Sequence, residues 1–259
     1  MKSTGITLPL SDIVNVGVYR FDEYDTIGVD HCEHKGFIVG HQRGEKPFGT
    51  RRWIEPTETD ITSDRSILDS LLILASKALP IRGEKSDRLV RSWCVKYGLP
   101  ACTVEASQQV GYLAFPLFQF YDFLFFLRDA FWKAESIHDG FSSNVFDENP
   151  YKRNSWYFTR ERKETLISEF INKADIRLHF EYKNGSPMFY NYAPDIISLV
   201  RYQFALTLLS DIERAPRRCK CCGSMFFAHR SNQLYGPCCT RQKRYAAERR
   251  RKEKEAQHG

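Results

Sequence analysis

Five of the eight cysteines fall between Cys219 and Cys239, and this cluster limits the possible folds of the chain more than any other feature. The N-terminal residues contain no apolar run of the length found in signal peptides, so we expect a cytoplasmic location with reduced thiols. Clustered cysteines in a reducing compartment indicate metal ligands before disulfides. The sequence therefore predicts a small metal-binding unit in its C-terminal part.

The first cysteine pair has the spacing of a zinc knuckle. Cys219 and Cys222 are separated by two residues and followed by Gly223, which permits the tight turn that brings two thiolates to one tetrahedral ion. A thioredoxin-type redox pair would need a βαβ pattern around this motif, and a long helix precedes it instead. The spacer that begins at Gly223 suits a compact finger in which Phe226 and Phe227 pack under the ion.

The second pair, Cys238 and Cys239, follows a Gly-Pro turn at a distance typical of zinc fingers. Four thiolate ligands leave no open position for water, so the sequence predicts one structural Zn²⁺ ion. Adjacent cysteines bind the same ion only if the backbone is locally contorted. His229, and after it Cys221, therefore stay open as substitute ligands.

The C-terminal part of the chain, which contains the cysteine cluster and the residues after it, is strongly basic. From Arg214 to Gly259 the chain has 13 Lys and Arg against three Glu, a net charge of +10, while the rest of the chain carries −4. Thr240 to Gln257 has no Gly or Pro and consists mostly of strong helix formers. This pattern predicts a basic helix that binds the phosphates of DNA or RNA. The predicted contact residues are Arg230, Arg241, Lys243, Arg244, Arg249, Arg250 and Arg251.

From Arg214 to Arg251 the sequence resembles the CGNR-type zinc-finger proteins of bacteria, and related bacterial proteins of unknown function that end in such a finger. The shared layout is a long helix, the motif R-x-C-x2-C-G-x2-F, a Tyr-flanked cysteine pair and a basic helix. The tetrad that names the family is replaced here by Cys-Thr-Arg-Gln, starting at position 239. The resemblance implies a helical N-terminal domain joined to a C-terminal finger that binds nucleic acid.

Upstream of the cysteines, apolar periodicity predicts several helices. The first helix is expected to start at Ser63 or Asp64 and to end before Pro80, and the second to cover Lys85–Tyr97. The third is expected to start near Pro116, and the last two to cover Arg160–Lys173 and Ile196–Ile212. Strands are expected at Val14–Tyr19 and Gly36–Gly40. The alternation of apolar and polar residues from Ile176 to Tyr192, around an Asn-Gly pair, predicts a β-hairpin.

These elements predict an α+β fold with a mainly helical body and a short β-hairpin, followed by the zinc finger and the basic helix. The expected division is a β-rich region at 1–60, a helical domain at 61–213 and the finger at 214–259. The most apolar run, Val110–Trp132, is interrupted by polar residues and Pro116. It therefore predicts a buried helix and no membrane span.

The sequence favours a binding protein over an enzyme, because it contains no G-x-S-x-G, P-loop or G-x-G-x-x-G motif. The run His31-Cys32-Glu33-His34, with His41 nearby, has the ligand types of a metal site, but a polar surface turn is the favoured interpretation. We expect a bacterial regulator whose finger binds nucleic acid and whose body senses a ligand or forms a homodimer. The alternative is a protein–protein adaptor with a purely structural zinc finger.

Overall fold

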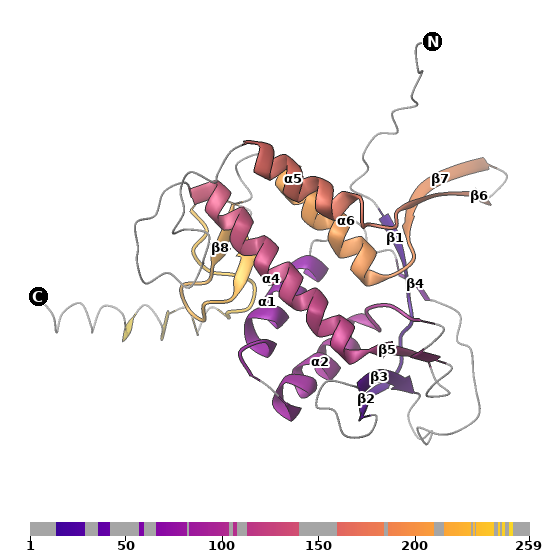
Figure 1. The fold of residues 1–259 in the computed structure, drawn as a ribbon, viewed down its shortest axis with the longest axis horizontal. Coiled ribbons are helices and arrows are strands. Elements are labelled where there is room, and N and C mark those ends of the chain that lie inside the picture. Colours follow the sequence, from indigo (N-terminus) through magenta and orange to yellow (C-terminus); the bar gives the residue numbers. More distant parts are fainter. Residues whose placement is uncertain are drawn as a thin grey trace, which may run out of the picture.

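The computed structural model shows an α+β fold (Figure 1). It describes residues 14–28, 36–41, 57–59, 66–81, 83–103, 106–107, 113–139, 160–183, 186–209, 215–228, 230, 232–240, 243, 245–246 and 249–250. Within these residues the chain forms five helices and three small sheets. The predicted fold class is therefore confirmed, with more strands than the few that the sequence indicated.

Each helix matches one that apolar periodicity predicted, with ends that differ by a few residues. The helices are α1 (Ser66–Ala78), α2 (Glu84–Tyr97), α4 (Leu117–Asp139), α5 (Arg160–Ile171) and α6 (Ile196–Leu209). Pro116 directly precedes α4, where its fixed φ suits the start of a helix. In the described part of the chain, no helix combines the length and apolarity that crossing a bilayer requires.

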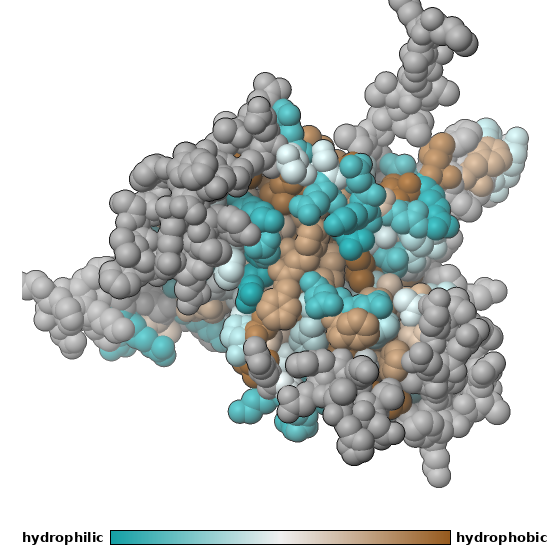
Figure 2. Space-filling model, viewed as in Figure 1, coloured by the Kyte–Doolittle hydropathy of each residue, from teal (hydrophilic) through white to brown (hydrophobic). Residues whose placement is uncertain are grey.

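Figure 1 shows α4 running across the front of the molecule, with α1 and α2 on one side and α5 and α6 on the other. One side of α4 is buried, but Phe118 and Phe125 point outward and are each 44% exposed. Figure 2 shows the corresponding apolar band on this face between polar residues. The central helix therefore forms both the middle of the core and part of the surface.

Two of the three sheets join strands from distant parts of the chain. The largest contains β4 (Thr57–Thr59), β1 (Val14–Val18), β7 (Ser186–Ala193) and β6 (Arg177–Lys183), in that order. The second contains β2 (Glu23–Gly28), β3 (Gly36–His41) and β5 (Ala114–Pro116), and the third pairs β8 (Pro216–Arg218) with β9 (Met225–Phe227). Of these pairs only β1 and β7 run parallel.

The hairpin predicted around Asn184-Gly185 is confirmed as β6 and β7, which pair antiparallel from Lys183↔Ser186 to Arg177↔Tyr192. The N-terminal strands pair outside the region 1–60, since β1 pairs with β7 and β3 with β5. The division of the chain into three domains stays a prediction.

Five phenylalanines link three helices to the last strand. Phe126 stacks on Phe170 with 4.9 Å between ring centroids, and Phe170 stacks on Phe204 at 4.2 Å. Phe227 then meets Phe204 at 5.4 Å and Phe131 at 5.6 Å, in both cases edge-on. These rings belong to α4, α5, α6 and β9, so the C-terminal hairpin and the helices share one aromatic core.

Polar side chains of α1 hold the outer edge of β9. The Met225 amide donates to Ser76 Oγ at 3.0 Å, and the Phe227 amide donates to the buried Asp69 carboxylate at 3.3 Å. Ser76 and Asp69 are seven residues apart and therefore lie on one face of the helix. Because unpaired strand amides are costly to bury, these two contacts fix the position of β9 against α1.

We expect the replacement Phe227→Ala to lower the free energy of unfolding by about 3–5 kcal/mol, as large-to-small changes of buried aromatic residues do. Phe118→Ala is the matched control, because it removes the same side chain from the surface of α4. Urea unfolding of the full chain measures both. Equal destabilisation by the two variants would contradict the assignment of Phe227 to the shared core.

Candidate metal centre

The first cysteine pair is formed by a turn directly after β8. The Gly223 amide donates to the Cys219 carbonyl at 2.8 Å, and the Cys219 amide donates to the Ser224 carbonyl at 2.9 Å. Gly223 has φ +70°, in the left-handed region that glycine adopts without strain. The turn that the sequence predicted at this glycine is therefore present, and it brings Cys222 back beside Cys219.

The second pair is held against the first by a close backbone approach at Gly236. A Cβ atom at this position would lie 3.0 Å from the Phe226 ring and 3.3 Å from Cys238 Sγ, so a larger residue would fit only if the Phe226 ring or the Cys238 side chain shifted slightly. The Cys239 amide donates to the Gly236 carbonyl at 3.3 Å, which closes the turn. Position 236 therefore contributes to the site through its small size.

The structure brings the thiols of Cys219, Cys222, Cys238 and Cys239 together, with all four sulfur atoms within 4.8 Å of one another. Individual Sγ–Sγ distances are 3.6 Å for 219–239, 3.2 Å for 222–238, 3.5 Å for 222–239 and 3.9 Å for 238–239. Four thiolates bound tetrahedrally at about 2.3 Å from one ion stand about 3.8 Å apart. The four cysteines thus have the spacing of a metal site, and adjacent Cys238 and Cys239 both contribute.

The site is closed on its inner side. Cys219 and Cys239 are 2% and 4% exposed and pack with Phe226 and Ala228 in a small separate cluster, whereas Cys222 is exposed. Four sulfur donors complete a tetrahedral shell and leave no position for a water or substrate. A metal bound here would therefore have a structural role.

Of the two aromatic residues expected under the ion, only Phe226 lies there. Phe227 is wrongly predicted, because its side chain packs with Phe131 and Phe204 in the main core. The physical reason is the alternation of side chains along β9, which points neighbouring residues to opposite faces.

Three of the clustered thiols have pKa values that are shifted from the ordinary cysteine value. Burial opposes ionisation of Cys222, but hydrogen bonds from Ser224 and from the thiols of Cys238 and Cys239 outweigh it and lower the Cys222 pKa to about 6. Burial, followed by the interaction with Cys222, raises the pKa of Cys238 to about 12. The pKa of Cys239 is also raised, again mainly by burial. At neutral pH the cluster therefore carries a thiolate at Cys222, which accepts hydrogen bonds from the neighbouring groups.

The substitute ligands have different positions. Cys221 lies at the rim, where its thiol donates to the Lys243 carbonyl at 3.5 Å, and it is not one of the four clustered donors. His229 lies outside the described residues. The four clustered cysteines form a complete tetrahedral set without either residue.

Four of the predicted nucleic-acid contacts are described and exposed: Arg230, Lys243, Arg249 and Arg250. Arg241, Arg244 and Arg251 lie outside the described residues. Residues 243, 245, 246, 249 and 250 are helical, in agreement with the helix predicted after the cysteines.

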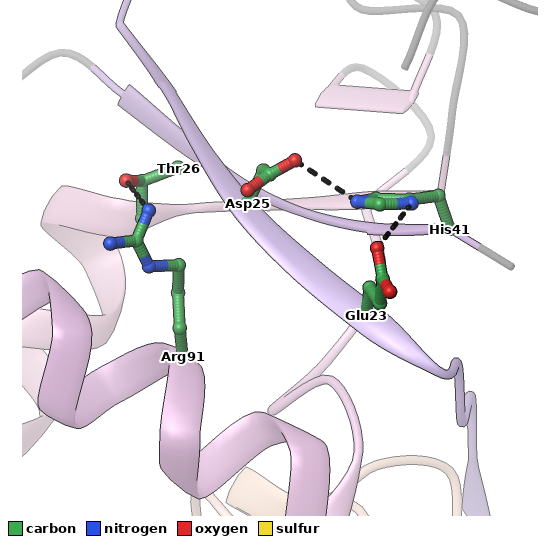
Figure 3. Close-up of polar contacts among 5 residues, drawn as sticks. All are labelled: Glu23, Asp25, Thr26, His41 and Arg91. Atoms are coloured by element: carbon green, nitrogen blue, oxygen red, sulfur yellow. Dashed lines mark hydrogen bonds and ion pairs between the residues drawn. The ribbon is translucent and has the colours of Figure 1, made fainter. Parts of the chain in front are cut away.

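His41 lies in a polar cluster with Glu23 and Asp25 that the sequence did not indicate (Figure 3). Its Nε2 lies 3.0 Å from Asp25 Oδ2, and its Nδ1 lies 3.9 Å from Glu23 Oε2. The ring thus lies between two carboxylates on the neighbouring strand, and its nitrogens point to different partners. The signal in the sequence was the spacing of Glu23 and Asp25, because residues two apart in a strand lie on the same face. His31, Cys32, Glu33 and His34 lie outside the described residues.

Comparison with known proteins finds no matching family model, and no match among curated proteins or solved structures. The geometry alone therefore supports the site: four cysteine thiols surround a position that fits one metal ion.

We expect Zn²⁺ binding to the metal-free chain at pH 7 to release at least two protons, one each from Cys238 and Cys239, whose thiol pKa values are raised. The apparent affinity should then rise at least about 100-fold per pH unit near pH 7. Below pH 6 the Cys222 thiolate also becomes protonated, so the dependence steepens. Calorimetric titration in buffers of different ionisation enthalpy counts the protons.

Two variants make this test specific. Cys221→Ser should bind Zn²⁺ with the same proton release, because Cys221 lies outside the four-thiol cluster. Cys222→Ser should weaken binding by at least tenfold, because loss of one thiolate opens the tetrahedral shell. Equal losses in the two variants, or binding without proton release, would rule out the four-cysteine assignment.

Proposed function

We propose that this protein is a zinc-finger nucleic-acid-binding protein, in which Zn²⁺ held by the four cysteines positions a basic C-terminal segment on DNA or RNA. Zinc is the favoured ion because it binds thiolates tetrahedrally and forms structural four-cysteine sites. The protein's proposed role is that of a bacterial regulator, in line with the resemblance to CGNR-type proteins. A cytoplasmic location, where the thiols stay reduced, belongs to the same proposal.

The observation that carries the proposal is the direct connection between the last cysteine and the basic residues. Thr240 follows Cys239, and its hydroxyl accepts a hydrogen bond from the Lys243 amide at 3.4 Å, as a helix N-cap does. The Cys221 thiol contacts the Lys243 carbonyl on the same turn. A metal at Cys239 would therefore fix the start of the basic segment.

The charge of the whole C-terminal part, the cysteine cluster included, supports a polyanionic partner. Net charge from Arg214 to Gly259 is +10, and the described members Lys243, Arg249 and Arg250 are exposed. Phosphate contacts by such residues release counterions from the nucleic acid, which favours binding at low salt without reading the base sequence. An acidic protein surface attracts the same charges, so an adaptor role is the competing outcome of the test below.

We expect the full chain to bind a DNA duplex of random sequence with an affinity that falls steeply as salt increases. Replacing Arg249, Arg250 and Arg251 with Ala should flatten the log–log salt dependence by up to about 2.7, since each lost phosphate contact removes about 0.9. Fluorescence anisotropy over a salt series measures the slope.

The matched control replaces three exposed basic residues of α2, Lys85, Arg88 and Lys96, with Ala. This control variant loses the same amount of positive charge, but from the body of the protein. Its log–log salt slope should differ from that of the native chain by no more than about 0.9, the value of one phosphate contact. The proposal fails if the chain binds neither duplex DNA nor single-stranded RNA at low salt. Binding to an acidic protein under those conditions would then support the adaptor.

A further inference from the structure

The cysteine cluster contains one thiol more than a tetrahedral ion needs. Cys219, Cys222, Cys238 and Cys239 complete the proposed shell, and Cys221 is left over beside them. Cys221 is half-buried and packs against the small buried cluster that includes Cys219 and Cys239. The chain therefore keeps a fifth sulfur atom next to its candidate metal ligands, and the metal site does not use it.

Cys221 also connects the cluster to the basic segment. A side-chain hydrogen bond joins the thiols of Cys221 and Cys239, and the Cys221 thiol donates to the Lys243 carbonyl at 3.5 Å. The Lys243 amide in turn donates to the Thr240 hydroxyl, directly after the last cysteine. A chemical change at the Cys221 sulfur therefore reaches a candidate metal ligand on one side and the start of the basic segment on the other.

The outer side of the cluster is open to small oxidants in the solvent. Cys222 is exposed and Cys221 is half-buried, whereas Cys239 is buried. Within the pair of Cys221 and Cys239, an oxidant therefore reaches Cys221 more easily, and a bound ion would leave the Cys221 sulfur unliganded. Redox-sensing cysteines are typically accessible and lie beside a second cysteine that completes a disulfide.

We propose that Cys221 and Cys239 form a disulfide when the protein meets a hydroperoxide, which makes the cysteine unit a redox switch. This goes beyond the proposed nucleic-acid function and builds on the proposed zinc site. The pair joins the one spare sulfur to a sulfur that the ion needs, so its formation opens a shell that is otherwise complete.

The reaction has two steps. The Cys221 thiol loses its proton to solvent, and its sulfur attacks the terminal oxygen of the hydroperoxide. The O–O bond breaks, which leaves a sulfenic acid at Cys221 and an alkoxide that takes up a proton as an alcohol. The Cys239 thiolate then attacks the sulfenic sulfur, and hydroxide leaves and takes up a proton to become water. Two electrons pass from the two sulfur atoms to the peroxide.

The disulfide would change both of the contacts that Cys221 makes. Zinc would lose Cys239 and keep three sulfur ligands, so we expect the ion to be released. The Cys221 sulfur would no longer carry the proton that it donates to the Lys243 carbonyl, which frees the start of the basic segment. Reduction by a thiol reverses the disulfide, so zinc should bind again afterwards.

Zinc release from the full chain in hydrogen peroxide tests the proposal, with a zinc-sensitive dye as the readout. The native protein should release its zinc, whereas Cys221→Ser should release it at least about fivefold more slowly. Serine keeps a hydroxyl that can donate to the Lys243 carbonyl, so this variant removes only the oxidisable sulfur. Cys102→Ser is the matched control and should behave like the native protein, because Cys102 is also half-buried but lies outside the cluster, beside Ser107.

Peptide mapping by mass spectrometry identifies the disulfide in the zinc-loaded chain and in the metal-free chain. We expect a bond between Cys221 and Cys239 in both. The proposal is overturned if Cys221→Ser releases zinc as fast as the native protein, if the disulfide joins any other pair, or if reduction does not reverse the oxidation. None of these readouts involves nucleic acid, so a reduced chain that binds neither DNA nor RNA would contradict the proposed function and leave the switch standing.

Discussion

Burial of β9 against the helices is the interaction on which both the cysteine cluster and the body depend. Neighbouring residues of this strand point in opposite directions, so Phe226 packs under the cysteines while Phe227 enters the core between α4 and α6. Its outer amides are held by Ser76 and Asp69 of α1. A strand of three residues thereby joins a candidate metal centre to the main hydrophobic core, and a disturbance on either side reaches the other.

The cysteine unit has little apolar packing of its own. Its buried cluster contains Cys219, Phe226, Ala228 and Cys239, which is too few residues to fold independently. Units of this size usually need a metal or disulfides, and in such units the free energy of metal binding supplies that of folding. In the proposed zinc form, the ion would hold the two turns together while β9 holds the unit on the body. The exposed basic residues after Cys239 are then displayed from a fixed base.

The sequence predicted the features that are encoded locally. Apolar periodicity located the helices, and the Asn-Gly pair located the hairpin of β6 and β7. The C-x2-C spacing with Gly223 identified the first turn of the cluster. The short strands β4 and β5 were missed, because each forms only by pairing with a strand far away in the chain, as when Pro116 pairs with Phe37. The inward direction of Phe227 was missed because neighbouring residues of β9 point to opposite faces.

X-ray absorption at the zinc edge of the purified full chain decides whether the four cysteines hold zinc, because it reports the element and its ligands together. We expect zinc bound by four sulfur atoms at about 2.3 Å with no nitrogen or oxygen ligand. Protein that is fully folded without zinc, or zinc with a nitrogen or oxygen ligand in place of a cysteine, would rule out the four-cysteine zinc site.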